Sequence, residues 1–322
     1  MTLDREPVDS TVDLTTEVAG MTLTSPVLTA AGCGGTGREL EDYLALDTVG
    51  AFTTRTITLD PTPGAPTPRL VETPSGMLTE TGGQNPGMQG FLATELPWLA
   101  QRRVRTVVSI AGTTLGEYAE LARRVASSPG VSALEVNLVS TNRDAYERRF
   151  CDDGYQIGRV LSAVAGEVPR GVSVLAKLAP GSGLVELARS AARNGADGVV
   201  LVHGFPGVRF DPDTWRPSLG GVTGTVGGPA VLTQALRCVW DVHRAMPDLP
   251  LVGVGGVRSG FDVVQMLLAG ASAVQVGTTL LSDPGAVRRI TEELAHELAA
   301  HDVKRPADLV GAGHPDLERD TT

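Results

Sequence analysis

The chain has 322 residues, of which 42% are hydrophobic and 20% are charged, a composition that is ordinary for a globular protein. Its formal net charge of −10 argues against nucleic acid or an anionic membrane as the main partner. No apolar stretch is long enough to span a bilayer, and residues 1–11 lack the basic and apolar regions of a signal peptide. The 3 cysteines lie far apart, without the spacing of a disulfide framework or a metal site, and indicate a reducing, cytoplasmic location.

A short apolar run followed by an amphipathic helical stretch recurs along the chain. Strands are predicted over 26–30, 50–56, 105–111, 133–138, 172–178, 197–203, 250–255 and 272–277. Most of these runs are continuously apolar, which is typical of parallel strands covered by helices. Helices are predicted over 115–127, 184–194, 230–245, 261–269 and 284–300. Eight such repeats predict one domain, residues 1–322, with the fold of a (β/α)8 TIM barrel, and an open doubly wound sheet is the less favoured alternative.

Three segments do not fit the repeat. Residues 12–24 predict a hairpin that turns at Ala19-Gly20 and caps the bottom of the barrel. The long segments 59–87 and 204–229 follow the carboxyl ends of strands, so they are expected over the active face as a lid or substrate pocket. The polar tails, 1–11 and 311–322, are expected to be mobile.

Glycines mark the ends of the last two predicted strands, as the pair Gly255-Gly256 and as Gly277 in Gly277-Thr278. In TIM barrels the loops after strands seven and eight often bind phosphate, and glycine lets backbone N–H groups approach it closely. Gly227-Gly228, just before a predicted helix, supplies a possible third edge. The alternative is that these glycines only form tight turns, but two such loops in consecutive units favour a phosphate site.

Lys177 ends an apolar strand, where an ammonium group requires a partner because burying it alone is very costly. One interpretation is a structural ion pair, with Glu135 on the preceding strand as the candidate partner. The other is a cation that faces a cofactor ring which becomes negative during the reaction. The position at the end of a barrel strand favours the functional interpretation.

Four strings of this sequence are similar to one enzyme family. They are VETPSGML at 71–78, QNPG at 84–87, ELPWL at 95–99 and AGASAVQVGT at 269–278. The stretch from about residue 23 to about residue 300 resembles the class 1, soluble branch of the dihydroorotate dehydrogenases. The resemblance implies an FMN-binding barrel in which the two last glycine loops hold the phosphate and Lys177 contacts the pyrimidine edge of the flavin. The FMN-binding residues that it implies are Ala31, Gly32, Arg55, Thr56, Ser109, Asn137, Lys177, Gly227, Gly228, Gly255, Gly256, Gly277 and Thr278.

The family oxidises dihydroorotate to orotate. In this branch, a cysteine base on the loop after strand four takes the C5 proton while the C6 hydride passes to flavin N5. Here the base position is Ser140, within Asn137-Leu138-Val139-Ser140-Thr141-Asn142, and the class 2 branch uses a serine at this place. A serine hydroxyl needs an acceptor for its own proton, so the alternative is an ordinary loop serine. The flanking asparagines favour the catalytic interpretation, with Ser140 and Lys177 as the catalytic pair.

Several substrate positions depart from the family pattern. The residues that the resemblance places at the substrate are Arg55, Thr79, Gly82, Gly83, Asn137, Asn142 and His203. Lysine is replaced by Arg55, whose planar fork can still grip a carboxylate. Thr79, Ser109 and His203 each replace an asparagine, and Gly82-Gly83 replaces Gly-Leu. For His203 two interpretations stay open, a strand-end histidine with its hydrogen bonds satisfied or a new donor or acid near neutral pH.

Three hypotheses follow for the function. The first is dihydroorotate oxidation, and the second is the same flavin chemistry on another small carboxylate-bearing ring or enoyl compound. The third is a flavin-binding or electron-transfer subunit without turnover. An RNA-modifying flavoenzyme is disfavoured by the acidic charge. The resemblance also implies a homodimer and a partner subunit that contains FAD and an iron–sulfur cluster. The cluster is expected on the partner, because this chain has no cysteines spaced to bind one.

Overall fold

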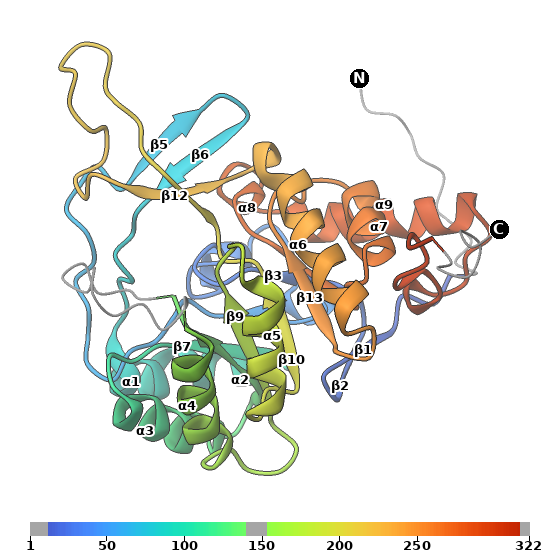
Figure 1. The fold of residues 1–322 in the computed structure, drawn as a ribbon, viewed down its shortest axis with the longest axis horizontal. Coiled ribbons are helices and arrows are strands. Elements are labelled where there is room, and N and C mark those ends of the chain that lie inside the picture. The colour runs from blue at the N-terminus through green and yellow to red at the C-terminus, as the bar shows by residue number, and fades with distance from the viewer. Residues whose placement is uncertain (1–11, 140–152, 316–322) are drawn as a thin grey trace.

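Eight parallel strands form the centre of the computed structural model, which describes residues 12–139 and 153–315. The strands lie in the order β3-β14-β13-β10-β9-β8-β7-β4 (Figure 1). Their bounds are β3 Val27–Thr29, β4 Phe52–Thr53, β7 Thr106–Ile110, β8 Val131–Asn137, β9 Ser173–Leu178, β10 Gly198–Leu201, β13 Leu251–Val254 and β14 Ala273–Val276. The sheet closes where Thr29 N donates to Ala51 O at 3.2 Å and Gly50 N donates to Val27 O at 3.0 Å. The predicted TIM barrel is therefore confirmed, and every predicted strand falls on an observed one.

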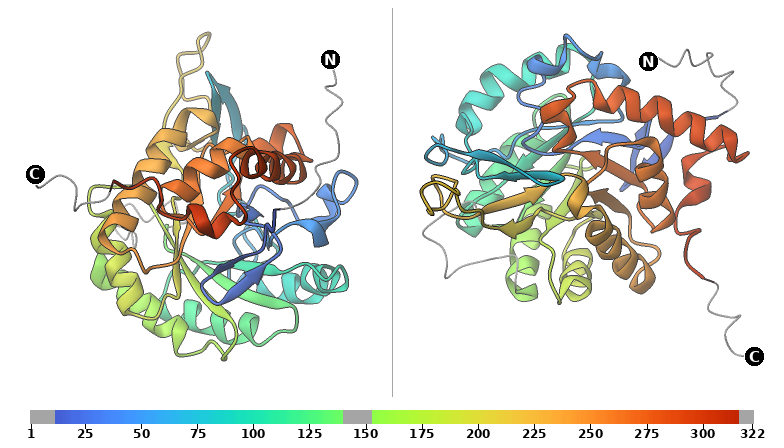
Figure 2. Two further views of the ribbon diagram at one scale, coloured as in Figure 1. Left: turned by 90° about the vertical axis from the view of Figure 1, so that its right-hand side faces the viewer. Right: turned by 90° about the horizontal axis from the view of Figure 1, so that it is seen from above.

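Helices cover the outside of the barrel (Figures 1 and 2). The α-helices are α1 Gly87–Gly90, α2 Leu96–Gln101, α3 Leu115–Ala126, α4 Gly154–Ala165, α5 Leu184–Arg193, α6 Leu232–Ala245, α7 Gly260–Leu268, α8 Thr279–Ser282 and α9 Ala286–Ala300. A π-helical stretch, η3 Phe91–Glu95, joins α1 to α2, and the 3₁₀ turns are η1 Arg38–Leu40, η2 Leu46–Thr48, η5 Pro229–Val231 and η6 Pro306–Leu309. The five predicted helices are confirmed, although the one predicted from residue 230 begins as the turn η5 before α6. None of the helices in the described ranges is long and apolar enough to cross a membrane.

An N-terminal hairpin, β1 Thr16–Val18 and β2 Met21–Leu23, caps the bottom of the barrel. Ala19 and Gly20 both have positive φ, 49° and 78°, as the tight turn of a hairpin requires. The hairpin residues Val18, Met21 and Leu23 belong to the same buried apolar cluster as the lower residues of the barrel lumen. Ser173 at the start of β9 donates its hydroxyl to Ala19 O at 2.6 Å. The expected cap is confirmed.

The two long segments meet in a second, antiparallel sheet outside the barrel. Its order is β11-β12-β6-β5, with β5 Leu70–Thr73, β6 Gly76–Thr79, β11 Phe205–Gly207 and β12 Gly224–Gly227. Thr225 of β12 lies opposite Thr79 of β6. This sheet lies at the opposite end of the molecule from β1 and β2, so the long segments do cover the expected face (Figures 1 and 2). Their pairing into one sheet was not predicted from the sequence.

The beginning of the C-terminal tail packs on α7. Gly311 N donates to Leu267 O at 2.9 Å and Gly313 N donates to Leu268 O at 3.1 Å. The His314 ring stacks on Trp240 with ring centroids 3.7 Å apart. The prediction of a mobile tail from residue 311 is therefore wrong for residues 311–315, because these backbone groups complete the end of α7. Residues 1–11 and 316–322 lie outside the described residues.

Candidate active site

Lys177 at the end of β9 is buried inside the barrel and paired. Its Nζ donates to Gln275 Oε1 at 3.0 Å and lies 3.6 Å from Glu135 Oε1. Gln275 Nε2 in turn donates to Glu135 Oε2 at 2.7 Å. The suggested ion pair with Glu135 is present, and Gln275 is a further partner that the sequence analysis missed. Its only signal was a glutamine in an otherwise apolar strand, AVQV.

Three of the residues assigned to the cofactor form a hydrogen-bonded row at the carboxyl ends of neighbouring strands. The hydroxyl oxygens of Thr56 and Ser109 lie 2.9 Å apart, and Asn137 Nδ2 donates to Thr56 Oγ1 at 3.2 Å. Asn137 also accepts a bond from Tyr118 Oη on its backbone oxygen, at 2.7 Å. Since Ser109 and Asn137 are buried, the row is held rigidly at the top of the barrel.

The glycine loops predicted to bind phosphate converge. A Cβ added to Gly227 would lie 2.2 Å from Thr278 Oγ1, and one added to Gly256 would lie 2.6 Å from the backbone nitrogen of Leu232. Gly228 and Gly256 have φ of 97° and 79°, which glycine adopts without strain. The loops after β12, β13 and β14 therefore meet beside the start of α6. This close approach of bare backbone fits a bound phosphate group.

The loop after β3 lies against the loop after β14. A Cβ added to Gly277 would lie 3.3 Å from Ala30 Cβ and 3.5 Å from Cys33 Sγ. Ala31 and Gly32 lie between Ala30 and Cys33 in the chain. Gly32 has a φ of 82°, and no atom lies within 4 Å of the position where its Cβ would be. Burial raises the pKa of the Cys33 thiol to about 11, against the lowering effect of Lys177, so the thiol stays protonated at neutral pH.

Arg55 follows β4, and its charge acts on the pKa values of two carboxyl groups, Glu95 and Glu39. Burial raises the pKa of Glu95, although the charge of Arg55 acts in the opposite direction. Arg55 also contributes to the lowered pKa of Glu39, where hydrogen bonds within 36–39 outweigh the effect of burial. The Arg55 Nε atom is buried and has no hydrogen-bond partner among the described residues. Such a donor fits a residue that binds an anionic ligand.

His203 follows β10 beside Lys177. Burial lowers the pKa of its imidazole to about 4, and the charge of Lys177 lowers it further. The ring is therefore neutral at physiological pH, so the hypothesis of an acid near neutral pH is not supported, whereas a neutral donor or acceptor is. The next residue, Gly204, is packed against Thr225, because a Cβ there would lie 2.0 Å from Thr225 Cγ2. Thr79 lies opposite Thr225, and its hydroxyl donates to the backbone oxygen of Thr225 at 3.4 Å. The outer sheet therefore packs next to Gly204, the residue that follows His203.

The remaining predicted substrate residues are not joined to this group. Gly82 and Gly83 both have positive φ, and a Cβ on Gly82 would lie 2.3 Å from the backbone nitrogen of Ala65. They therefore shape the long loop, and the described residues show no contact that links them to Lys177. Ser140 and Asn142 lie outside the described residues.

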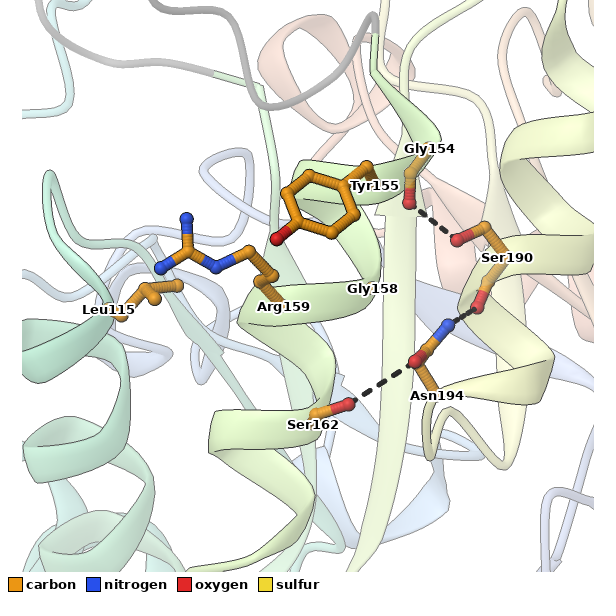
Figure 3. A pocket seen from close by; sticks show the side chains of 8 residues that line it. All are labelled: Leu115, Gly154, Tyr155, Gly158, Arg159, Ser162, Ser190 and Asn194. Carbon is orange, nitrogen blue, oxygen red and sulfur yellow. Dashed lines mark hydrogen bonds between the residues drawn. The ribbon is translucent and has the colours of Figure 1, made fainter.

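A surface groove of about 500 Å³ between α4 and α5 is separate from this site (Figure 3). Its polar side chains are hydrogen-bonded within the groove: Ser190 Oγ donates to the backbone oxygen of Gly154 at 2.5 Å, and Asn194 Nδ2 donates to that of Ser190 at 2.8 Å. The groove lies on the outer helices, whereas Lys177 points into the barrel. Nor do the described residues contain a cluster of His, Cys, Asp or Glu that could hold a metal ion.

A closed barrel with a buried cation inside it and a glycine cradle at its carboxyl end places the chain in the class of phosphate-binding TIM-barrel proteins. A family model described as dihydroorotate dehydrogenase matches residues 13–298. The catalytic subunit of dihydroorotate dehydrogenase B (NAD(+)) of Pelobacter propionicus is 41% identical over 301 residues, covering 93% of this chain and 98% of that protein. The protein of the same description from Desulforudis audaxviator is 40% identical over 298 residues, covering 92% and 96%.

The fold comparison agrees with the sequence comparisons. A crystal structure of DHODH from Eimeria tenella in complex with ferulenol superposes with a TM-score of 0.79 at 21% identity, covering 98% of this chain and 92% of the other. This chain belongs to the dihydroorotate dehydrogenase family. It is thus an FMN-dependent oxidoreductase of the kind that acts on CH–CH bonds, and the glycine cradle and the buried Lys177 fit FMN.

Proposed function

We propose that this chain oxidises dihydroorotate to orotate, with its FMN lying over the Thr56–Ser109–Asn137 row and against Lys177. The single observation that carries the proposal is Lys177, a buried cation near the carboxyl end of β9 that is held inside the barrel by Gln275 and Glu135. When bound, FMN supplies the hydride acceptor at its N5 atom. The phosphate would be held by the three glycine loops, and Ala31 and Gly32 would border the ring.

The substrate is held and deprotonated by residues of this chain. Arg55 binds the carboxylate with its guanidinium group, whose Nε is buried without a partner among the described residues, and Asn137 and Asn142 bind the ring amides. Ser140 takes the C5 proton. Its hydroxyl passes its own proton to an acceptor or water, because an alcohol is a weak base. The neutral His203 and Thr79 complete the pocket from the side of the outer sheet.

The electrons then leave through a second subunit. The relatives are named as catalytic subunits of an NAD(+)-linked enzyme, which supports a partner that carries the electron-transfer centres. We propose an FAD- and iron–sulfur-containing partner, with NAD(+) as the final acceptor. The free thiols of Cys33 and Cys238 support the cytoplasm as the location.

A homodimer is also proposed. Val208, Phe210 and Trp215, on the segment before β12, are 51%, 60% and 85% exposed. An exposed group of large apolar side chains supports an interface with another chain. A Trp215→Ser variant is expected to weaken the dimer in sedimentation experiments, and an unchanged dimer would place the interface elsewhere.

Anaerobic stopped-flow absorbance tests the reaction. Dihydroorotate is expected to bleach the yellow FMN of the purified protein within seconds. Ser140→Ala is expected to slow the bleaching by about 100-fold or more, the usual contribution of a general base. Ser127→Ala, which removes a hydroxyl that donates to Arg123 O within α3, is the matched control. Persistent yellow colour with dihydroorotate would refute the proposed substrate.

A second candidate function is the same chemistry on another small ring or enoyl compound that carries a carboxylate. The observation that favours it is the changed pocket: a neutral histidine at position 203 and threonine at position 79, where the family pattern has asparagines. This candidate predicts weak binding of orotate and bleaching by a different carboxylate substrate. Rapid bleaching by dihydroorotate together with tight orotate binding would exclude it.

A further inference from the structure

A layer of polar side chains crosses the barrel lumen directly beneath the flavin site. Gln275 of β14 donates through Nε2 to Glu135 of β8 at 2.7 Å and to Thr53 Oγ1 of β4 at 3.3 Å. Each of these three side chains is at most 1% exposed. Glu135 and Gln275 stand two positions before Asn137 and Gly277, and alternate residues of a strand point to the same side. The layer is therefore the floor of the site.

The space beneath this floor is apolar. Ala133, Leu175 and Ala273 stand two positions before Glu135, Lys177 and Gln275, and all three belong to the buried cluster that the N-terminal hairpin closes. No interaction below the layer offsets the charge of Glu135 in the described part of the chain. Glu135 Oε1 accepts no hydrogen bond there, and its nearest cation is Lys177 at 3.6 Å.

Buried opposite charges at this distance interact strongly, because little water screens them. The carboxylate therefore offsets part of the positive charge of Lys177. Gln275 fixes the geometry, since its carbonyl oxygen holds Nζ while its amide nitrogen holds the carboxylate. A change in Glu135 would thus alter the electrostatic potential above Lys177 without touching the ligand.

We propose that Glu135 and Gln275 are positioning residues that set the reduction potential of FMN through Lys177. The proposal rests on the proposed placement of the flavin against Lys177. The negative charge gained when FMN takes up a hydride is stabilised by Lys177 and opposed by Glu135. Glu135 therefore keeps the potential lower than Lys177 alone would, so that electrons pass readily to the partner subunit.

The midpoint potential of bound FMN, titrated against reference dyes, tests the proposal. Glu135→Gln keeps the shape but removes the charge, and it is expected to shift the reduction equilibrium at least tenfold towards reduced FMN, about 30 mV for two electrons. Glu135→Asp keeps the charge and is expected to stay within threefold of the unaltered protein. Glu186→Gln, which removes a carboxylate from the outer helix α5, is the control and should leave the potential unchanged.

A merely structural role predicts the reverse order, because aspartate fits the site worse than glutamine does. An unshifted potential in Glu135→Gln, or equal shifts in both variants, would overturn the proposal. If Glu135→Gln does not retain FMN, Glu135→Asp decides alone, and a shift beyond threefold counts against the proposal. The titration needs no substrate, so it stays informative if dihydroorotate proves not to be the substrate, and absorbance first establishes that FMN is bound.

Discussion

The hydroxyl oxygens of Thr56 and Ser109 lie 2.9 Å apart, and Asn137 donates to the same Thr56 oxygen at 3.2 Å. Ser109 stands where the family pattern has an asparagine. Its contact with Thr56 is therefore made by a hydroxyl group instead of a side-chain amide. Thr56 is consequently the central member of the row. Its removal leaves two buried polar groups, on Ser109 and Asn137, without their partner.

Thr56→Val is expected to weaken FMN binding about tenfold, because a buried polar group left unpaired costs about 1–3 kcal/mol and 1.4 kcal/mol corresponds to tenfold in affinity. The recovery of flavin fluorescence on release from the protein measures the dissociation constant. Thr291→Val makes the same replacement at a half-buried helix position, where the hydroxyl bonds to Val287 O, and should not change FMN binding. Equal affinities in the two variants would remove Thr56 from the flavin site.

His203 makes the stability of the protein depend on pH. Its imidazole takes up a proton near pH 6.5 in the unfolded chain but only near pH 4 in the folded chain, because burial and Lys177 disfavour the charged form. The unfolded state therefore binds more protons between these values, so the free energy of unfolding falls as the pH is lowered from 6.5 towards 4. Above pH 6.5 both states are neutral and this effect disappears.

His203→Asn is expected to lose that part of the pH dependence. Urea denaturation at pH 7.5 and at pH 5 measures it, and the decrease in the free energy of unfolding should be smaller in His203→Asn than in the unaltered protein. His301→Asn, at an exposed helix end, should retain the full decrease. The same decrease in all three proteins would contradict a neutral His203.

The barrel was predictable because its signals are local. Each strand is a short apolar run, and the hairpin turn at Ala19-Gly20 can be read from two residues. The outer sheet was not, because the bond from Thr79 to Thr225 joins positions 146 apart in the chain, and no short pattern encodes that pairing. The glycine loops and Lys177 were identified as candidate site residues from their positions at strand ends. The role of Gln275 could not be predicted, because it depends on contacts with Lys177 and Glu135 that form only in the closed barrel.

The conformation of Gly256 provides a test of the phosphate cradle. It has φ 79°, and a Cβ there would lie 2.6 Å from the backbone nitrogen of Leu232, which cannot move without displacing the start of α6. Gly256→Ala is therefore expected to lower the melting temperature and to abolish FMN retention during gel filtration. Gly171→Ala, at φ 93° with open space around the Cβ position, has similar backbone strain without the clash. FMN retention by both variants would show that the loop after β13 does not hold the phosphate.

Asn85 holds the base of the long loop that carries β5 and β6. Its Oδ1 accepts from Gly87 N at 2.8 Å and from Thr58 N at 3.2 Å, while Nδ2 donates to Thr58 Oγ1 at 2.8 Å and to Gly83 O at 2.9 Å. The side chain is 5% exposed, so Asn85→Ala leaves several buried groups unpaired.

The loop and the outer sheet should then lose their fixed position over the site. We expect Asn85→Ala to raise KM for the substrate about tenfold or more while the spectrum of bound FMN stays unchanged, because the glycine cradle and Lys177 belong to other elements. Asn194→Ala removes one hydrogen bond between α4 and the end of α5, from Ser162 Oγ, and one within α5, to Ser190 O, both away from the site, and should leave KM unaltered. Steady-state kinetics under identical conditions compares the two variants. If Asn85→Ala released FMN and left KM unchanged, the loop would belong to the cofactor half of the site, and the division between a barrel that binds flavin and an outer sheet that binds substrate would be wrong.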